Sequence, residues 1–132
     1  MARAPLYLLD SDLIVGVLRG KLEARAAPAS LKPAQIAISV TTYIEVGVGE
    51  FVRDARFHNT MQSLFAELDI RPLSVLAAQL AARQGGRLRR ENQQMGLGDL
   101  QIAATAVSEG RTLLTRNLEH FALFKGLKLE KW

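Results

Sequence analysis

A short apolar run that ends on two carboxylates constrains the fold of this chain more than any other feature. The run from Leu6 to Leu9 has no polar alternation, which is typical of a strand covered on both faces in a parallel sheet. From Leu13 to Leu18 apolar residues recur at helical spacing, so Ser11 or Asp12 is expected to cap a helix. Asp10 is therefore expected at the carboxyl end of a central strand, where open α/β sheets bind ligands.

Length and composition predict one globular domain over residues 1–132. A chain of 132 residues buries about two-thirds of its unfolded surface. Hydrophobic residues make up 48% and charged residues 23%, which argues against disorder. No run approaches the roughly 20 apolar residues of a membrane span, and the first apolar run is too short for a signal peptide. We therefore expect a cytoplasmic protein with no membrane partner.

Strand and helix patterns alternate along the chain. Apolar runs predict strands near 36–38, 70–73, 112–115 and 127–130, and Pro72 and the last run suit sheet edges. Helical periodicity is expected from about 42 to 52, from 53 to 68, from Ser74 through Ala82, and from 99 to 107, where Gly110 ends the helix. This alternation predicts an α/β fold with a parallel sheet of about four to five strands flanked by helices.

Glu45 is the second acid of interest. Thr41 or Thr42 is expected to cap its helix, which places Glu45 in the first turn on the same face as Val48. Glu50, in contrast, is expected to be solvated. A carboxylate in a first turn can also serve only the helix dipole, so this interpretation of Glu45 stays open beside a functional one.

Asp99 and Asn117 complete a set of polar residues at corresponding places. Asp99 begins a uniform helix and shares its small apolar face with Ile102, Ala103 and Ala106. Asn117 follows the strand at 112–115, as Asp10 follows the first strand. A parallel sheet brings such positions together at one edge.

A cluster of Asp10, Glu45 and Asp99 needs a compensating charge. Carboxylates ~4 Å apart repel by about 4 kcal/mol per pair at an effective dielectric near 20, so a cation or shifted protonation must stabilise them. The chain has no cysteine, and oxygen ligands without thiolates select Mg²⁺ or Mn²⁺. Such an ion polarises a phosphoryl oxygen and activates water. The implied substrate is a phosphodiester or a phosphomonoester. Asp12 could assist this site or only cap its helix.

Basic residues permit a polyanionic partner. The formal net charge is +4, which on its own is also common in proteins that never bind nucleic acid. Arginines concentrate around Gly85 and Gly86, and one more follows the strand at 112–115. We take these as candidate RNA contacts, although a solvated helix end is the alternative. The candidates are Arg83, Arg87, Arg89, Arg90 and Arg116.

Apolar residues exceed what one small core needs. The helix expected over 53–68 carries a stripe that includes Phe57, Met61 and Phe65, outside the segments that hold the acids. Such a stripe forms either core or a contact between copies. We expect a homodimer.

Four segments in order resemble the PIN-domain ribonucleases, in particular the VapC-type toxins of toxin–antitoxin pairs. The segments cover 8–14, 39–45, 98–106 and 114–121, and the resemblance extends over essentially the whole chain. It implies a parallel sheet between helices, Mg²⁺ or Mn²⁺ at the acidic cluster, RNA cleavage, homodimers and inhibition by a cognate antitoxin in a type II pair. Each of these is an expectation about this chain.

The resemblance also implies roles for single residues. Asp10, Glu45 and Asp99 would form the acidic core that binds the metal, and Thr115 would orient the site through its hydroxyl. Asn117 stands where many relatives have a fourth aspartate, so a second metal ion would be held less firmly.

Two other interpretations remain. In a haloacid-dehalogenase-like phosphatase Asp10 would be the nucleophile and Asp12 the general acid, but Ala103 and the absence of lysine from 98 to 123 argue against it. The other alternative is a catalytically inactive PIN domain that binds RNA or a protein partner. It fits only if no metal binds.

Overall fold

One parallel sheet forms the centre of the computed structural model, which describes residues 5–18, 33–53, 62–63, 65–66 and 68–132. The sheet has five strands in the order β3-β2-β1-β4-β5, and every neighbouring pair is parallel. The strands are β1 (Tyr7–Leu9), β2 (Ile36–Ser39), β3 (Asp69–Arg71), β4 (Thr112–Thr115) and β5 (Leu129–Lys131). The predicted α/β fold is confirmed, and Pro72 follows an edge strand as expected.

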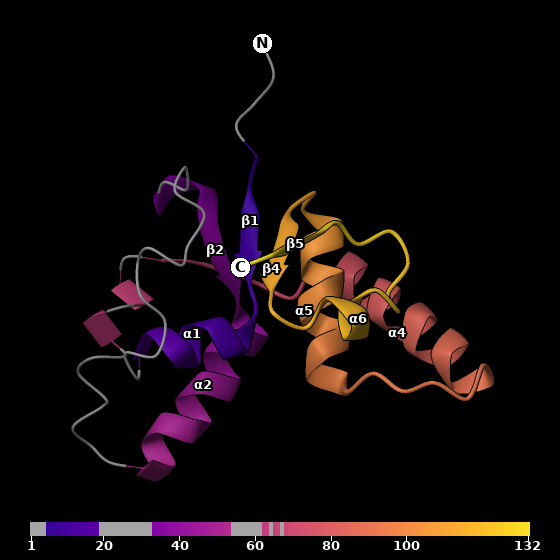
Figure 1. Ribbon diagram of the computed structural model, residues 1–132, viewed down its shortest axis with the longest axis horizontal. Helices are drawn as coiled ribbons and strands as arrows, with labels where there is room; N and C mark the ends of the chain where they lie inside the picture. The colour runs from indigo at the N-terminus through magenta and orange to yellow at the C-terminus, as the bar shows by residue number, and fades with distance from the viewer. Residues whose placement is uncertain (1–4, 19–32, 54–61, 64, 67) are drawn as a thin grey trace.

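Helices cover both faces of this sheet. They are α1 (Ser11–Leu18), η2 (Pro33–Gln35), α2 (Val40–Arg53), α4 (Val75–Arg90), α5 (Leu97–Ser108) and α6 (Leu118–Phe121). Figure 1 shows α1 and α2 on one side of the sheet and α4, α5 and α6 on the other. None of the helices in the described part of the chain combines the length and apolarity that crossing a membrane requires.

Successive residues of the central strands supply two separate hydrophobic cores. Leu8 packs in the core beneath α4, α5 and α6, whereas Leu9 packs in the core beneath α1 and α2. Leu113 and Leu114 of β4 divide in the same way. Because side chains alternate across a strand, a run without polar residues is what a doubly covered sheet requires. The interpretation of the first apolar run is therefore correct for Tyr7–Leu9, whereas Leu6 precedes β1 and is 40% exposed.

The predicted caps of α1 and α2 are wrong. Helix α1 begins at Ser11, and the backbone N–H of Ser11 donates to Oδ1 of Asp10 at 2.7 Å, so Asp10 itself precedes the helix. At the start of α2, Oγ of Ser39 accepts the backbone N–H of Thr42 at 2.9 Å, as an N-cap does. The N-cap of α2 is therefore Ser39, the last residue of β2, rather than Thr41 or Thr42. Helix α2 consequently begins at Val40, which places Glu45 in its second turn.

The expectation that Glu50 is solvated is also wrong. Its side chain is 3% exposed, and Val46, one turn earlier, is 2% exposed. Residues four apart share one face of a helix, so Glu50 follows Val46 toward the interior. Because Glu45 is one residue before Val46, it lies on a different face.

Helix α4 begins where the sequence predicts and ends later. Oγ of Ser74 accepts the backbone N–H of Ala77 at 3.1 Å and caps it. The helix then continues past Gly85 and Gly86 to Arg90. A Cβ at position 85 would lie 2.9 Å from Cδ1 of Leu100, so this glycine lets α4 and α5 approach closely. Gly110 ends α5 with a φ of 65°, as expected.

The stripe expected over 53–68 is described only in part. Phe57 and Met61 lie outside the described residues. Phe65 is 5% exposed, belongs to the core with α1 and α2, and its ring centre lies 4.9 Å from that of Tyr43. Phe65 is therefore a core residue, and a contact between copies needs another surface.

Candidate active site

Asp10 is the buried carboxylate of the site. It is 5% exposed at the end of β1, and its Oδ2 accepts the hydroxyl of Thr115 at 2.8 Å. Burial raises the pKa of Asp10 to about 6, with smaller contributions from the negative charges of Asp12 and Asp99, while the bonds from Thr115 and Ser11 oppose the rise. A buried carboxyl with this pKa near other acids is a candidate functional group.

Glu45 reaches the same edge from α2. Oγ of Ser11 donates to its Oε1 at 3.4 Å. A Cβ at position 98 would lie 3.0 Å from Oε1 of Glu45, so this carboxylate lies against the first turn of α5. Burial raises the pKa of Glu45, and the negative charge of Asp99 adds to this. The amino end of α5 offers the carboxylate a favourable dipole.

Asp99 is the third acid and links the other two. It lies in the first turn of α5, three residues after the N-cap position, Gly96. Its charge raises the pKa of both Asp10 and Glu45. Oδ2 of Asp99 lies 2.8 Å from Nε2 of His120. The three predicted acids therefore come from β1, α2 and α5 to one edge of the sheet.

Thr115 connects Asp10 to Asn117. Its Oγ1 donates to Asp10 and accepts the backbone N–H of Asn117 at 3.0 Å. The Asn117 side chain is exposed and makes no capping hydrogen bond with α6. Asn117 thus joins the site through its backbone, with its amide group facing solvent.

A chain of hydroxyls supports the edge beneath Glu45. Oγ of Ser39 donates to Oγ1 of Thr42 at 3.1 Å, and Oγ1 of Thr42 lies 3.3 Å from Oγ of Ser11, which donates its proton to Glu45. Ser39 and Thr42 are both completely buried. These bonds join β2, α2 and α1, which carry or border the acids. Asp12 is exposed in the first turn of α1, and its charge acts on Asp10 and Glu45.

The candidate RNA contacts have different surroundings. Arg83, Arg89 and Arg90 are exposed on α4, and Arg116 is exposed just after β4. Arg87 is instead engaged within the fold, because its guanidinium donates to Glu91 Oε2 at 2.9 Å, Gln84 Oε1 at 2.8 Å and the Leu123 carbonyl at 2.6 Å. It ties α4 to the chain that follows α6.

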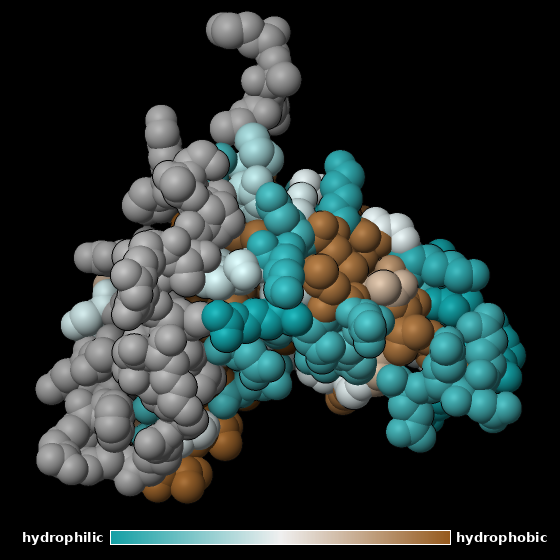
Figure 2. Space-filling model, viewed as in Figure 1, coloured by the Kyte–Doolittle hydropathy of each residue, from teal (hydrophilic) through white to brown (hydrophobic). Residues whose placement is uncertain are grey.

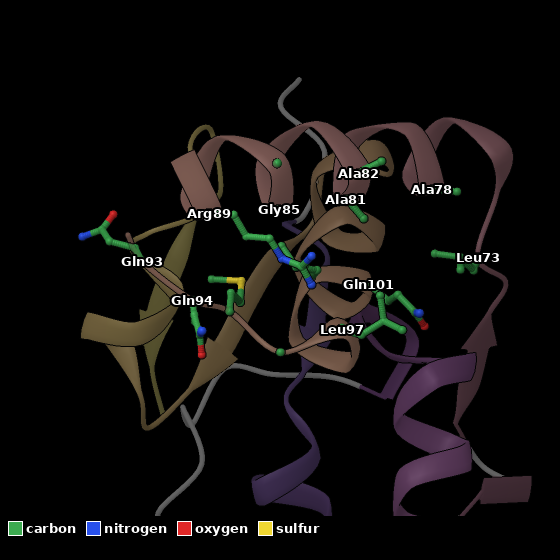
Figure 3. Close-up of a pocket in the computed structure, with 14 residues that line it drawn as sticks. Leu73, Ala78, Ala81, Ala82, Gly85, Arg89, Gln93, Gln94, Leu97 and Gln101 are labelled. Atoms are coloured by element: carbon green, nitrogen blue, oxygen red, sulfur yellow. The ribbon is translucent and has the colours of Figure 1, made fainter. Parts of the chain in front are cut away.

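A cavity of about 920 Å³ lies between α4, the loop after it and the start of α5. Figure 3 shows the side chain of Arg89 pointing into this space, whereas the side chain of Gln93 points away from it. No residue that lines the cavity is acidic. The cavity adjoins Gly96 and Leu97, at the start of the helix that carries Asp99.

Comparison with known proteins identifies curated relatives of the chain. No family model matches the chain. Ribonuclease VapC10 of Mycobacterium tuberculosis is 35% identical over 124 residues, which cover 93% of the chain and 91% of that relative. The chain belongs to the VapC ribonuclease family. The tRNA(fMet)-specific endonuclease VapC of Salmonella typhimurium is 23% identical over 128 residues, or 96% of the chain and 97% of the relative.

Solved VapC structures have the same fold. The DNA-bound VapBC of Salmonella typhimurium matches with a TM-score of 0.87 and 23% identity over 98% of this chain and 99% of that one. VapBC2 of Rickettsia felis, bound to a DNA fragment from its promoter, matches at 0.83 and 24% over 96% and 98%. The predicted PIN-like fold is confirmed. VapC membership leaves the haloacid-dehalogenase-like alternative without support.

The VapC site has a donor set that suits a hard divalent cation. Asp10, Glu45 and Asp99 present only oxygen, as Mg²⁺ and Mn²⁺ prefer. Within the described ranges, no three acidic or histidine side chains are close enough to hold one ion together. Mg²⁺ commonly takes one or two carboxylates and completes its shell with water and substrate phosphate. The donors therefore fit such an ion without a closed protein cage.

The sequence interpretation missed several groups that shape this VapC site. His120, Gly98 and the buried hydroxyls of Ser39 and Thr42 all contact or support an acid. Of these groups, only His120 could have been proposed from the sequence, because it lies three residues after Asn117 on the short helix that follows β4. The other contacts join segments far apart in the chain.

Proposed function

We propose that this chain is a Mg²⁺- or Mn²⁺-dependent endoribonuclease and the toxin of a type II toxin–antitoxin pair. The observation that carries the proposal is the position of Asp99, whose charge acts on both Asp10 and Glu45 at one sheet edge. Carboxylates that repel one another are stabilised by a cation or by a shifted protonation, and in a member of the VapC ribonuclease family we assign that role to a cation. Such a cation would act on the phosphate groups of RNA, which we propose as the substrate.

The side chains of the site have different roles in the proposed cleavage of RNA. A bound ion would polarise the scissile phosphoryl group and activate water for in-line attack. Asp10 and Asp99 would hold that ion, and Thr115 and Ser11 fix the orientation of Asp10 through its two oxygens. Glu45 would accept a proton from the attacking water, and burial and the charge of Asp99 raise its pKa in the direction that favours a proton acceptor.

An antitoxin partner is the second part of the proposal. Ile44, Val48 and Val52 of α2 are 58%, 61% and 81% exposed and border a shallow apolar hollow. Figure 2 shows hydrophobic surface at the lower edge of the molecule, where α2 lies in Figure 1. Glu45 lies between Ile44 and Val48 on this helix. A protein that covers this apolar face would close the edge that holds the acids, and the solved VapBC relatives support such a partner.

A second copy of the chain is the third part. Val75 and Leu97, at the amino ends of α4 and α5, are 76% and 72% exposed, and Leu76 is 56% exposed. These residues belong to α4 and α5 rather than to α2. The antitoxin would therefore cover the apolar face of α2, and a second copy would cover the exposed residues of α4 and α5. The second surface takes the place of Phe65, whose stripe was expected to form the contact between copies.

RNA cleavage by the purified chain tests the central proposal. We expect cleavage with Mg²⁺ or Mn²⁺ that EDTA abolishes, and no cleavage by Asp10→Asn or Asp99→Asn. Glu119→Gln, an exposed acid on α6, is the matched control and should remain active. Cleavage that resists EDTA would contradict metal dependence. RNA binding without cleavage in the presence of metal would favour the inactive PIN domain.

A further inference from the structure

Asp99 has a partner whose role lies outside the mechanism above. Nε2 of His120 lies 2.8 Å from Oδ2 of Asp99, and the two residues are 21 positions apart. His120 comes from α6, and Asp99 comes from the first turn of α5. Both side chains are partly exposed, at 27% and 35%. This hydrogen bond joins two separate elements at the edge of the site.

The imidazole of His120 is held in place by the core. Its ring meets Phe121 edge to face, with centres 5.3 Å apart and planes at 71°. Phe121 is 1% exposed, and its backbone N–H donates to the carbonyl of Asn117 at 3.3 Å. This bond closes the single turn of α6, and the buried ring of Phe121 anchors that turn on the core. Nε2 of His120, which Asp99 contacts, is therefore held in place, although α6 has only one turn.

The position of Asp99 needs such support. It is partly exposed and carries the same charge as Asp10 and Glu45, so repulsion favours rotamers that move its carboxylate toward solvent. A hydrogen bond at Oδ2 opposes this movement and leaves Oδ1 as the oxygen available to a ligand. Neighbours that orient a metal ligand typically change metal affinity or activity by about 10- to 100-fold when they are removed.

We infer that His120 is a positioning residue that holds Oδ2 of Asp99, so that Oδ1 is presented to the divalent cation shared with Asp10. This inference rests on the proposed metal-dependent function. It adds a residue from α6 that acts through Asp99 and makes Asp99 a ligand through one oxygen.

Two substitutions separate positioning from packing. His120→Phe keeps an aromatic ring beside Phe121 and removes the donor, whereas His120→Gln keeps a nitrogen donor at comparable reach and removes the ring. Positioning predicts that His120→Phe weakens Mn²⁺ binding by about 10- to 100-fold, and that His120→Gln restores most of the affinity. Calorimetric titration with Mn²⁺ alone measures this, and Glu119→Gln is the control on the same helix. His120→Leu provides a second donor-free variant if His120→Phe does not fold.

The outcomes distinguish this inference from the proposed function. Equal Mn²⁺ affinity in the wild type, His120→Phe and His120→Gln would overturn the positioning role, even if the wild type cleaves RNA. Folded wild type that binds Mn²⁺ and cleaves no RNA would overturn the proposed function, while the order of affinities would still test His120. In RNA cleavage we expect His120→Phe to reduce kcat at saturating RNA and to be partly rescued by excess Mn²⁺.

Discussion

Gly98 leaves room for the carboxylate of Glu45, because a Cβ at position 98 would lie 3.0 Å from Oε1 and 3.2 Å from Cδ of that side chain. Gly98 is the second residue of α5 and directly precedes Asp99. The placement of two of the three acids, Glu45 and Asp99, therefore depends on the residue at position 98. An added methyl group must move Glu45, since the helix backbone cannot yield easily.

We predict that Gly98→Ala reduces RNA cleavage, because the Glu45 carboxylate must shift by a few tenths of an ångström, and that the reduction is smaller than the roughly 100-fold cost of a 1 Å misplacement. Stability should not fall in parallel, because alanine favours a helix over glycine by up to about 1 kcal/mol. Gly96→Ala is the matched control, since nothing lies within 4 Å of a Cβ there. Equal cleavage rates in both variants would contradict the proposed role of Glu45.

The raised pKa of Asp10 predicts how stability depends on pH. Its value rises from 3.8 to about 6 in the folded chain, mainly through burial. Between these values the folded state binds more protons than the unfolded state, so the free energy of unfolding falls as pH rises through this window. The contribution is fully present below about pH 4 and is lost above about pH 6. The shift corresponds to about 3 kcal/mol at most.

Asp10→Asn removes this dependence. In metal-free buffer the variant should be more stable than the wild type at pH 7, and the difference should shrink toward pH 4. Urea unfolding at several pH values measures it. Added Mn²⁺ should stabilise the wild type and leave the variant unchanged. A variant that is less stable than the wild type at pH 7 would show that hydrogen bonds, not burial, dominate at Asp10.

Asn117 predicts the number of metal ions. With three ionised acids the site carries three negative charges, so one divalent ion leaves it at minus one and two leave it at plus one. An amide oxygen is a weaker ligand for a hard dication than a carboxylate. We expect one Mn²⁺ per chain in the absence of RNA, and a stoichiometry that approaches two in Asn117→Asp. Two tightly bound ions in the wild type would contradict the charge argument and point to Asp12, whose charge acts on Asp10 and Glu45, as an additional ligand.

The arginines of α4 should separate into two groups. Replacing Arg83, Arg89 and Arg90 by glutamine should reduce the salt dependence of RNA binding by about 0.7 log units per charge lost. Arg87→Gln should instead destabilise the fold by about 1 to 3 kcal/mol, because it removes bonds to Glu91 and the Leu123 carbonyl. Salt titrations and urea unfolding measure the two effects. An unchanged salt dependence of RNA binding in the triple variant would show that these three arginines do not contact RNA.

The two apolar surfaces should respond to different substitutions. Leu97→Asp should convert a dimer into a monomer in sedimentation experiments, because it places a charge on the surface at the amino ends of α4 and α5. Val48→Asp should leave the dimer intact and weaken binding of a co-expressed antitoxin. Both residues are more than half exposed, so neither change should unfold the chain. A wild-type monomer at micromolar concentration would contradict the proposed dimer.

Sequence by itself determined the features that depend on neighbours along the chain. An apolar run such as Leu6 to Leu9 can be buried only in a sheet covered on both faces, so the α/β fold and the strand edge at Asp10 followed from it. The cap at Ser74 and the turn at Gly110 were equally local. The order of strand and helix patterns then placed Glu45 and Asp99 at the same edge, because parallel strands all end on one side.

Only the tertiary structure decided which groups touch. The contacts of Gly98 with Glu45, of His120 with Asp99 and of Thr115 with Asp10 each join segments that are distant in the chain, so no periodicity reports them. Packing also decided burial against local expectation. Glu50 is buried because the packing of the whole face of α2 that includes Val46 sets the rotation of the helix. The location of the acids was therefore readable from sequence, whereas their orientation and support depended on how the helices pack on the sheet.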